Sequence, residues 1–135
     1  MANRLYDKGR QGFLDGDISW RDDNIKCVLV DLADYTPDFA NDEFLSAITA
    51  NARVAIAGNL ANKTSTAGVA DADDVTFSTV VGDPTEALVC YQDSGLPATS
   101  RLIAYIDTAT GIPVTPNGGD VTVQWDSGSN KIFKL

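Results

Sequence analysis

Short runs in which apolar and polar residues alternate fill much of the second half of the chain, and they constrain its fold more than any other feature. The run "DVTVQW" at 120–125 places Val121, Val123 and Trp125 on one side of a strand, and 75–79 alternates in the same way. Successive side chains of a strand point to opposite faces, whereas a helix repeats about every 3.6 residues. Turn sequences separate the runs, at 82–84, 93–98, 110–119 and 126–130. The pattern predicts a mostly β chain, folded as an antiparallel β-sandwich or a barrel-like domain.

Segment 24–35 is apolar at most positions of its first half. Its two faces carry Ile25, Cys27 and Leu29 on one side and Val28 and Val30 on the other. A strand that is apolar on both faces is typical of a sheet covered on both sides, so we expect this strand to be buried on both. Two later runs also divide into faces: Leu88 and Cys90 against Ala87, Val89 and Tyr91, and Leu102, Ala104 and Ile106 against Ile103 and Tyr105. Further strands are expected at 18–20, 53–58, 60–68 and 131–135.

Two helical segments interrupt the β pattern. In residues 1–16, Leu5, Gly9 and Phe13 recur at every fourth position and Tyr6 and Leu14 widen the stripe, which predicts a short N-terminal helix or arm. A second short helical segment is expected through Phe44, Leu45 and Ile48. With no repeat and no linker, residues 1–135 are expected to form a single β-rich domain, with a β-sandwich over 17–135.

Charge and composition exclude several classes of function. The chain has 19 acidic and 10 basic residues, a net charge of −9, and no histidine. Such an acidic chain repels phosphate backbones, so we expect no nucleic-acid partner. Without histidine there is no Ser-His-Asp or Cys-His catalysis and no His-ligated zinc, and we expect neither catalytic residues nor a cofactor. No apolar run reaches the ~20 residues that span a bilayer, and residues 1–17 contain no continuous apolar stretch, so we expect no membrane partner and synthesis in a cytoplasm.

The two cysteines, Cys27 and Cys90, each lie in the middle of an expected strand. Three interpretations follow: a buried reduced pair that fills the core, a disulfide between the two strands, and a redox role. A disulfide requires the two strands to be neighbours with Cα atoms about 5.5–6 Å apart. The reduced pair suits a cytoplasmic product, and a redox role lacks both a CxxC spacing and a cationic neighbour other than Lys26.

The acidic run "DADD" is the weak calcium candidate of the sequence. Asp71, Asp73 and Asp74 place carboxylates at close positions of an extended segment, and oxygen ligands suit Ca²⁺. The run lacks the spacing, the glycine and the distal glutamate of an EF-hand loop. The alternative is a solvated segment that leads into a strand, so we assign no metal on this pattern.

The order of several blocks along the chain is distinctive. They are "ANRLYDKGRQGFLDGDISW" at 2–20, "IKCVLVDLADYTPD" at 25–38, "NDEFLSAI" at 41–48, "GVADADDVTFSTV" at 68–80, "EALVCYQDSG" at 86–95 and the ending at 100–135, "SRLIAYIDTATGIPVTPNGGDVTVQWDSGSNKIFKL". Together these blocks resemble small virion structural proteins of tailed bacteriophages. The resemblance covers nearly the entire chain, and the ending is its most specific part.

The resemblance implies a β-rich, non-enzymatic protein that is made in the host cytoplasm and built into the virion. Within that group we favour a capsid decoration (cement) protein on the outer surface of the capsid, which binds the major capsid protein and associates with itself, as a trimer. The alternatives are a neck, tail or fibre-associated component and, from another class, a carbohydrate-binding or host-adhesion module; an enzyme of lysis is a third.

Two sequence features are candidate contacts of such a protein. The stripe Leu5, Tyr6, Phe13 and Leu14 is a candidate contact to the capsid or to a sister subunit, with the alternative that it closes the protein's own sheet. The closing run "KIFKL" is expected to form an edge strand that extends a neighbour's sheet.

Overall fold

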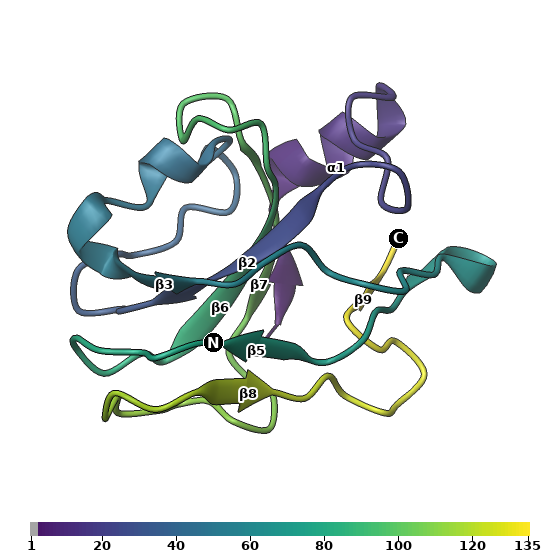
Figure 1. The fold of residues 1–135 in the computed structure, drawn as a ribbon. Helices are drawn as coiled ribbons and strands as arrows, with labels where there is room; N and C mark the ends of the chain where they lie inside the picture. The colour runs from purple at the N-terminus through teal and green to yellow at the C-terminus, as the bar shows by residue number, and fades with distance from the viewer. Residues whose placement is uncertain (1–2) are drawn as a thin grey trace.

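A five-stranded antiparallel sheet organises the computed structural model, which describes residues 3–135 (Figure 1). The strands are ordered β1-β7-β6-β2-β3 across the sheet. Their bounds are β1 Arg4–Leu5, β2 Ile25–Val30, β3 Arg53–Ile56, β6 Ala87–Gln92 and β7 Arg101–Ile106. The mostly β, antiparallel fold predicted from the alternating runs is therefore confirmed.

Smaller elements surround this sheet. Two two-stranded ribbons pair β4 Val69–Ala70 with β9 Phe133–Lys134, and β5 Val75–Phe77 with β8 Val121–Val123. The helix α1 spans Asp7–Leu14, and three short 3-10 turns follow, at η1 Leu45–Ala47, η2 Ala50–Ala52 and η3 Thr66–Gly68. Within residues 3–135 no helix has the length and apolar character needed to cross a membrane.

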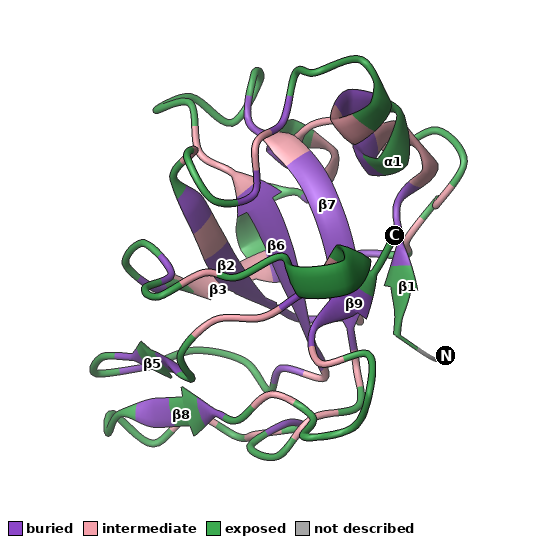
Figure 2. Cartoon of the chain, turned by 90° about the vertical axis from the view of Figure 1, so that its right-hand side faces the viewer, coloured by how far each residue is buried: buried purple, intermediate pink, exposed green. Residues whose placement is uncertain are grey.

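Both faces of the sheet are buried, as the apolar pattern of segment 24–35 predicts (Figure 2). On one face Ile25, Cys27 and Leu29 pack with Leu88 and Cys90 under the two ribbons. On the other face Val28 and Val30 pack with Ala87, Val89 and Tyr91 under the segment that follows β2. That segment contributes Tyr35, Leu45, Ile48 and Ala52. The core is thus two apolar layers separated by one sheet.

Strand β7 departs from its predicted alternation. Leu102 belongs to the apolar cluster of one face, whereas Ile103 and Ala104, which follow it directly, both belong to the cluster of the other. The cause is a β-bulge, because Cys90 pairs with Ala104 while Tyr91 pairs with Leu102, which leaves Ile103 as an extra residue. An extra residue shifts the alternation by one position. The prediction that Leu102 and Ala104 share a face is wrong for this reason.

The helix α1 packs closely on β7 and on the segment that follows the helix because two of its residues, Gly9 and Gly12, are glycines. A Cβ atom on Gly9 would lie 2.6 Å from the backbone oxygen of Leu102, and one on Gly12 would lie 2.7 Å from Cδ1 of Ile18. Glycine lowers helix propensity by about 1 kcal/mol relative to alanine. Here its missing side chain allows the helix backbone to approach the strand, so packing compensates for the low propensity.

Two predicted strands are absent from the described chain, at 18–20 and over most of 60–68. Residues 18–23 instead form a turn, in which the backbone N–H of Ser19 donates to Oδ2 of Asp23 at 2.7 Å. Such local hydrogen bonds, in which an aspartate side chain accepts from a nearby backbone N–H, compete with strand pairing. In addition, β5 ends at Phe77 because Thr79 adopts a φ of 50°, outside the strand region.

Candidate interaction surface

Cys27 and Cys90 face each other across the centre of the sheet. They are direct partners in the register of β2 and β6, and their Sγ atoms lie 3.4 Å apart. Both side chains are fully buried, and both thiols are free. The requirement that the two strands be neighbours is thus met, and the chain presents the pair in its reduced form.

The surroundings of the pair are those of a core rather than of a reactive thiol. Burial and the neighbouring Cys90 raise the pKa of the Cys27 thiol well above its ordinary value, which disfavours the nucleophilic thiolate. The cation nearest in sequence, Lys26, pairs with Asp93, with 3.2 Å between Nζ and Oδ2. Cys27 and Cys90 therefore act as packing residues unless an oxidant reaches them.

The four residues of the N-terminal stripe lie in three different environments. Leu5 and Tyr6 are 7% and 0% exposed and belong to the protein's own core, on opposite faces of the sheet. Phe13 is half-buried against the ring of Phe133, with 5.9 Å between centroids. Leu14 is 89% exposed. Of the predicted interface residues only Leu14 is fully available to a partner, because Leu5 of β1 and Tyr6, which follows it, are buried in the two layers of the core.

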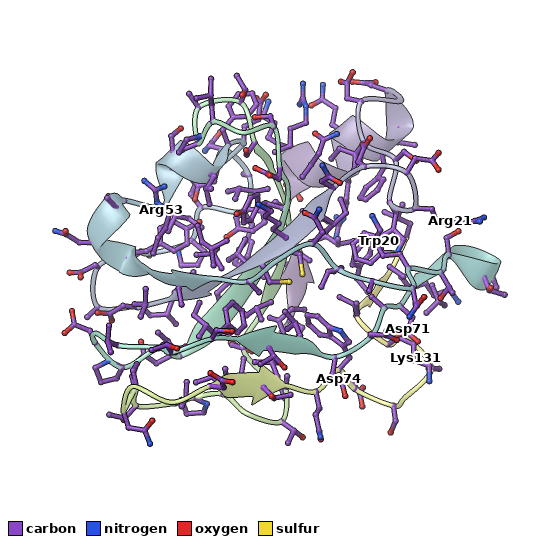
Figure 3. The ribbon with its side chains drawn as sticks, in the orientation of Figure 1. Trp20, Arg21, Arg53, Asp71, Asp74 and Lys131 are labelled. Carbon is purple, nitrogen blue, oxygen red and sulfur yellow. The ribbon has the colours of Figure 1, made fainter. Side chains whose placement is uncertain are left out.

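An aromatic cluster continues from Phe13 across the surface. Trp20 packs edge-to-face on Phe133 at 5.2 Å, and its Nε1 donates to the backbone oxygen of Thr64 at 2.9 Å. Phe13, Trp20 and Phe133 line a cavity of about 370 Å³ that is open to solvent and whose rim includes Arg21 and Asp22. Figure 3 shows where Trp20 and Arg21 lie. Trp20 is only 6% exposed, so it offers an edge rather than a flat stacking platform. Sequence inspection missed this cluster, because 13, 20 and 133 belong to elements that show no shared pattern.

The calcium candidate does not converge into one site. Asp73 Oδ2 accepts from Asn62 Nδ2 at 2.5 Å, and Asp74 Oδ1 accepts from the backbone N–H of Trp125 at 3.1 Å. Figure 3 shows Asp71 and Asp74 apart from each other. Asp74 thus joins the loop before β5 to the segment that follows β8, and Asp73 joins it to the loop that contains Asn62. Both carboxylates are exposed and directly precede β5, which matches the alternative of a solvated segment that leads into a strand.

A different acidic cluster brings three carboxylates together. Oxygen atoms of Asp31, Asp34 and Asp83 lie within 4.8 Å of one another, with Asp31 buried and the other two exposed. Asp31 Oδ1 accepts from the backbone N–H of Ala33 at 2.9 Å. The sequence separates Asp34 from Asp83 by the length of several elements, so only the fold reveals the cluster. Exposed acidic groups are common without a bound metal, so we assign no metal to this cluster.

A buried hydrogen-bonded chain ties the segment after β2 to the start of the protein. Tyr35 Oη donates to Asp42 Oδ2 at 2.6 Å, so Tyr6 Oη, 2.9 Å away, donates to Tyr35. Burial is the main cause that raises the pKa of both phenols above the ordinary value. Both tyrosines are consequently neutral near pH 7 and act as fixed donors.

A scan of the chain against protein-family models and a search of curated proteins find no match. The fold, the free surfaces and the resemblance of the sequence blocks therefore carry the functional argument.

Proposed function

We propose that this chain is a non-enzymatic structural protein of a tailed-bacteriophage virion. It is a capsid decoration protein that binds the outside of the major capsid lattice as a homo-oligomer, a trimer, and stabilises that lattice. The observation that carries the proposal is the ordered resemblance of blocks over nearly the whole chain, above all the ending at 100–135.

Charge supports an exterior position. The net charge of −9 would repel packaged nucleic acid if the protein lined the inside of a shell. On the outer surface the same charge faces water and keeps particles apart in solution.

The exposed end of α1 supports a docking role. Leu14 is 89% exposed and lies one residue beyond Phe13, which lines the aromatic cavity. Leu14 and the half-buried Phe13 together offer apolar area to a partner at the end of α1. In this proposal Leu14 and the aromatic cavity contact the major capsid protein.

Copy number in purified particles tests the proposal. A decoration protein is expected near parity with the major capsid protein, in hundreds of copies per particle. A neck, tail or fibre component would number on the order of a dozen to a few dozen copies, as closed symmetric assemblies require. A ratio far below parity would remove the decoration proposal.

A binding assay tests the proposed surface. Particles that lack this chain are mixed with the purified protein, and bound copies are counted after sedimentation. Leu14→Asp is expected to reduce binding by about tenfold or more, because it places a charge at an apolar contact. Leu96→Asp is the matched control, since Leu96 is 63% exposed in the loop between β6 and β7. Equal binding by both variants would exclude the end of α1 as the contact.

A further inference from the structure

A groove between strands β1 and β9 gathers positive charge on this acidic chain. It has a volume of about 330 Å³ and lies between residues 3–5 and residues 130–134. Figure 2 shows β1 and β9 next to each other at this place. Four of the ten basic residues line the groove, and only one of the 19 acidic residues does. The basic residues are Arg4, Arg10, Lys131 and Lys134, and the acidic residue is Asp126.

The positive charge of the groove is largely free. Among residues 3–135, Lys131 and Lys134 form no ion pair; Lys131 Nζ donates to the backbone oxygen of Ser127 at 3.3 Å. Arg10 lies 3.7 Å from Asp7, but both side chains are about half exposed, and such a pair is weak in water. Arg4 borders the groove, but its guanidinium lies 4.6 Å from the ring centre of Phe39, on the other face of the sheet, so the charge inside the groove comes mainly from the lysines and Arg10.

Each of the two strands also turns backbone groups away from its own partner. Tyr6 donates its backbone N–H to Ile103, so in β1 the next residue back, Leu5, forms the non-hydrogen-bonded pair with Ala104. Leu135 donates to Gly68, so Lys134 of β9 forms the non-hydrogen-bonded pair with Val69. The N–H and C=O of Leu5 and Lys134 therefore point away from β7 and β4. Both residues line the groove.

We propose that this groove binds an extended acidic segment of a second copy of the chain, so that the copies associate head to tail. Open strand edges supply backbone hydrogen bonds to an added strand, and the lysines select a segment of negative charge. The second copy supplies the complementary charge. Its surface outside the groove is more negative than the net charge of −9, because the groove itself contains four basic residues and only one acidic residue. A groove that binds a different surface of its neighbour is a heterologous contact, which gives a ring or an open chain of subunits. The inference rests on the self-association part of the proposed function and names its surface.

Sedimentation velocity of the full chain tests the groove. At about 0.1 M salt, where charges act over roughly 10 Å, the repulsion between two chains of net charge −9 is screened beyond that distance while contacts at the groove persist, and the wild-type chain is expected to associate in a concentration-dependent way. At about 1 M salt the association is expected to weaken. The double variant Lys131→Glu and Lys134→Glu is expected to weaken it by about tenfold or more in dissociation constant.

A second double variant controls for net charge. Lys8→Glu with Arg21→Glu changes the charge by the same amount, and neither residue lines the groove. Lys8 lies two positions before Arg10 and so on nearly the opposite side of α1. This control is expected to associate like the wild type, and thermal unfolding checks that both double variants are folded.

Two results would overturn the groove proposal: a wild-type chain that stays monomeric at all concentrations and salts, and association that both double variants retain equally. The virion proposal fails separately. A chain that associates through the groove but is absent from particles would refute the virion function and leave the groove supported.

Discussion

The five-stranded sheet and the two ribbons are built from the same kinds of residue but differ in how they are held. Strands β2, β6 and β7 are six residues long and pair along most of their length. Strands β4, β5, β8 and β9 are two or three residues long, and each pairs with one partner only. The sheet is buried on two faces, whereas the ribbons present one face to the core and one to water (Figure 2).

This difference indicates that the sheet provides the stability of the fold, while the ribbons are available for contacts with a partner. Long ladders with buried side chains open only when the whole domain unfolds, while short ribbons with exposed hydrogen bonds open locally. The sheet therefore holds the fold, and the ribbon edge at β9 keeps free backbone groups for a partner. The predictions below test that division, from the largest expected effect to the smallest.

Truncating a sheet residue is expected to cost far more than truncating one at the ribbon edge. Leu29 is fully buried, and Leu29→Ala should lower the free energy of unfolding by about 3 kcal/mol or more, because it leaves a cavity between the layers. Leu135, next to β9, is 59% exposed, and Leu135→Ala should change it by less than about 0.5 kcal/mol. Chemical denaturation measures both. Equal losses in the free energy of unfolding of the two variants would contradict the division of roles between the sheet and the ribbon edge.

Adding a methyl group at the contact between α1 and β7 is expected to have the next largest effect on stability. Gly9→Ala places its Cβ against the backbone oxygen of Leu102 and should destabilise the protein by roughly 1–3 kcal/mol, despite alanine's better helix propensity. Gly58→Ala is the matched control, since a Cβ there meets no atom within 4 Å. That variant should be neutral or slightly stabilising. A stabilised Gly9→Ala variant would show that α1 does not need its close approach to β7.

The sheet should lose stability in alkali. Burial, with Asp93 and Asp107 nearby, raises the pKa of Tyr91 and Tyr105 to about 12. The unfolded chain releases these protons near pH 10, before the folded chain does. The stabilisation is therefore complete below about pH 10 and is lost as the pH rises towards 12, by at most ~1.4 kcal/mol per pH unit for each tyrosine.

Denaturation at several pH values measures this loss, and Tyr105→Phe should reduce its slope. A free energy of unfolding that stays constant from pH 9 to pH 12 would contradict the raised pKa values of Tyr91 and Tyr105.

The smallest effect is expected at the cysteines. Because Cys27 and Cys90 are fully buried, a thiol alkylating reagent should modify neither in the native protein and both after unfolding. Intact mass before and after reduction then reports whether the pair has oxidised, since a disulfide gains two hydrogens and a free pair gains none. Rapid labelling of the folded chain would show that the sheet opens locally at its centre.

Sequence analysis predicts best the strands in which the alternation of residues along a single strand shows which side chains lie on which face of the sheet. The two faces of Ile25–Val30 and Ala87–Gln92 follow from alternation alone, and with them the burial of Cys27 and Cys90. Alternation fails in β7, where one bulged residue at Ile103 shifts the faces. No local signal in the sequence marks that bulge.

The candidate surfaces were harder to predict, because they form between segments far apart in the chain. The groove joins residues 3–5 to residues 130–134, and the aromatic cavity joins Phe13 to Phe133. The expectation that "KIFKL" forms an edge strand does identify β9, but the sequence does not reveal which edge it faces. Composition shows only a scarcity of basic residues, not their gathering at one place.

Hydrogen exchange on the free and the self-associated chain tests the division between sheet and edge most directly. The account predicts that amides in the centre of β2 and β6 exchange only by global unfolding in both states, while those of Leu5 and Lys134 exchange fast in the free chain and slow on association. Unchanged exchange of Leu5 and Lys134 on association, or exchange in β2 and β6 as fast as in β9, would contradict it.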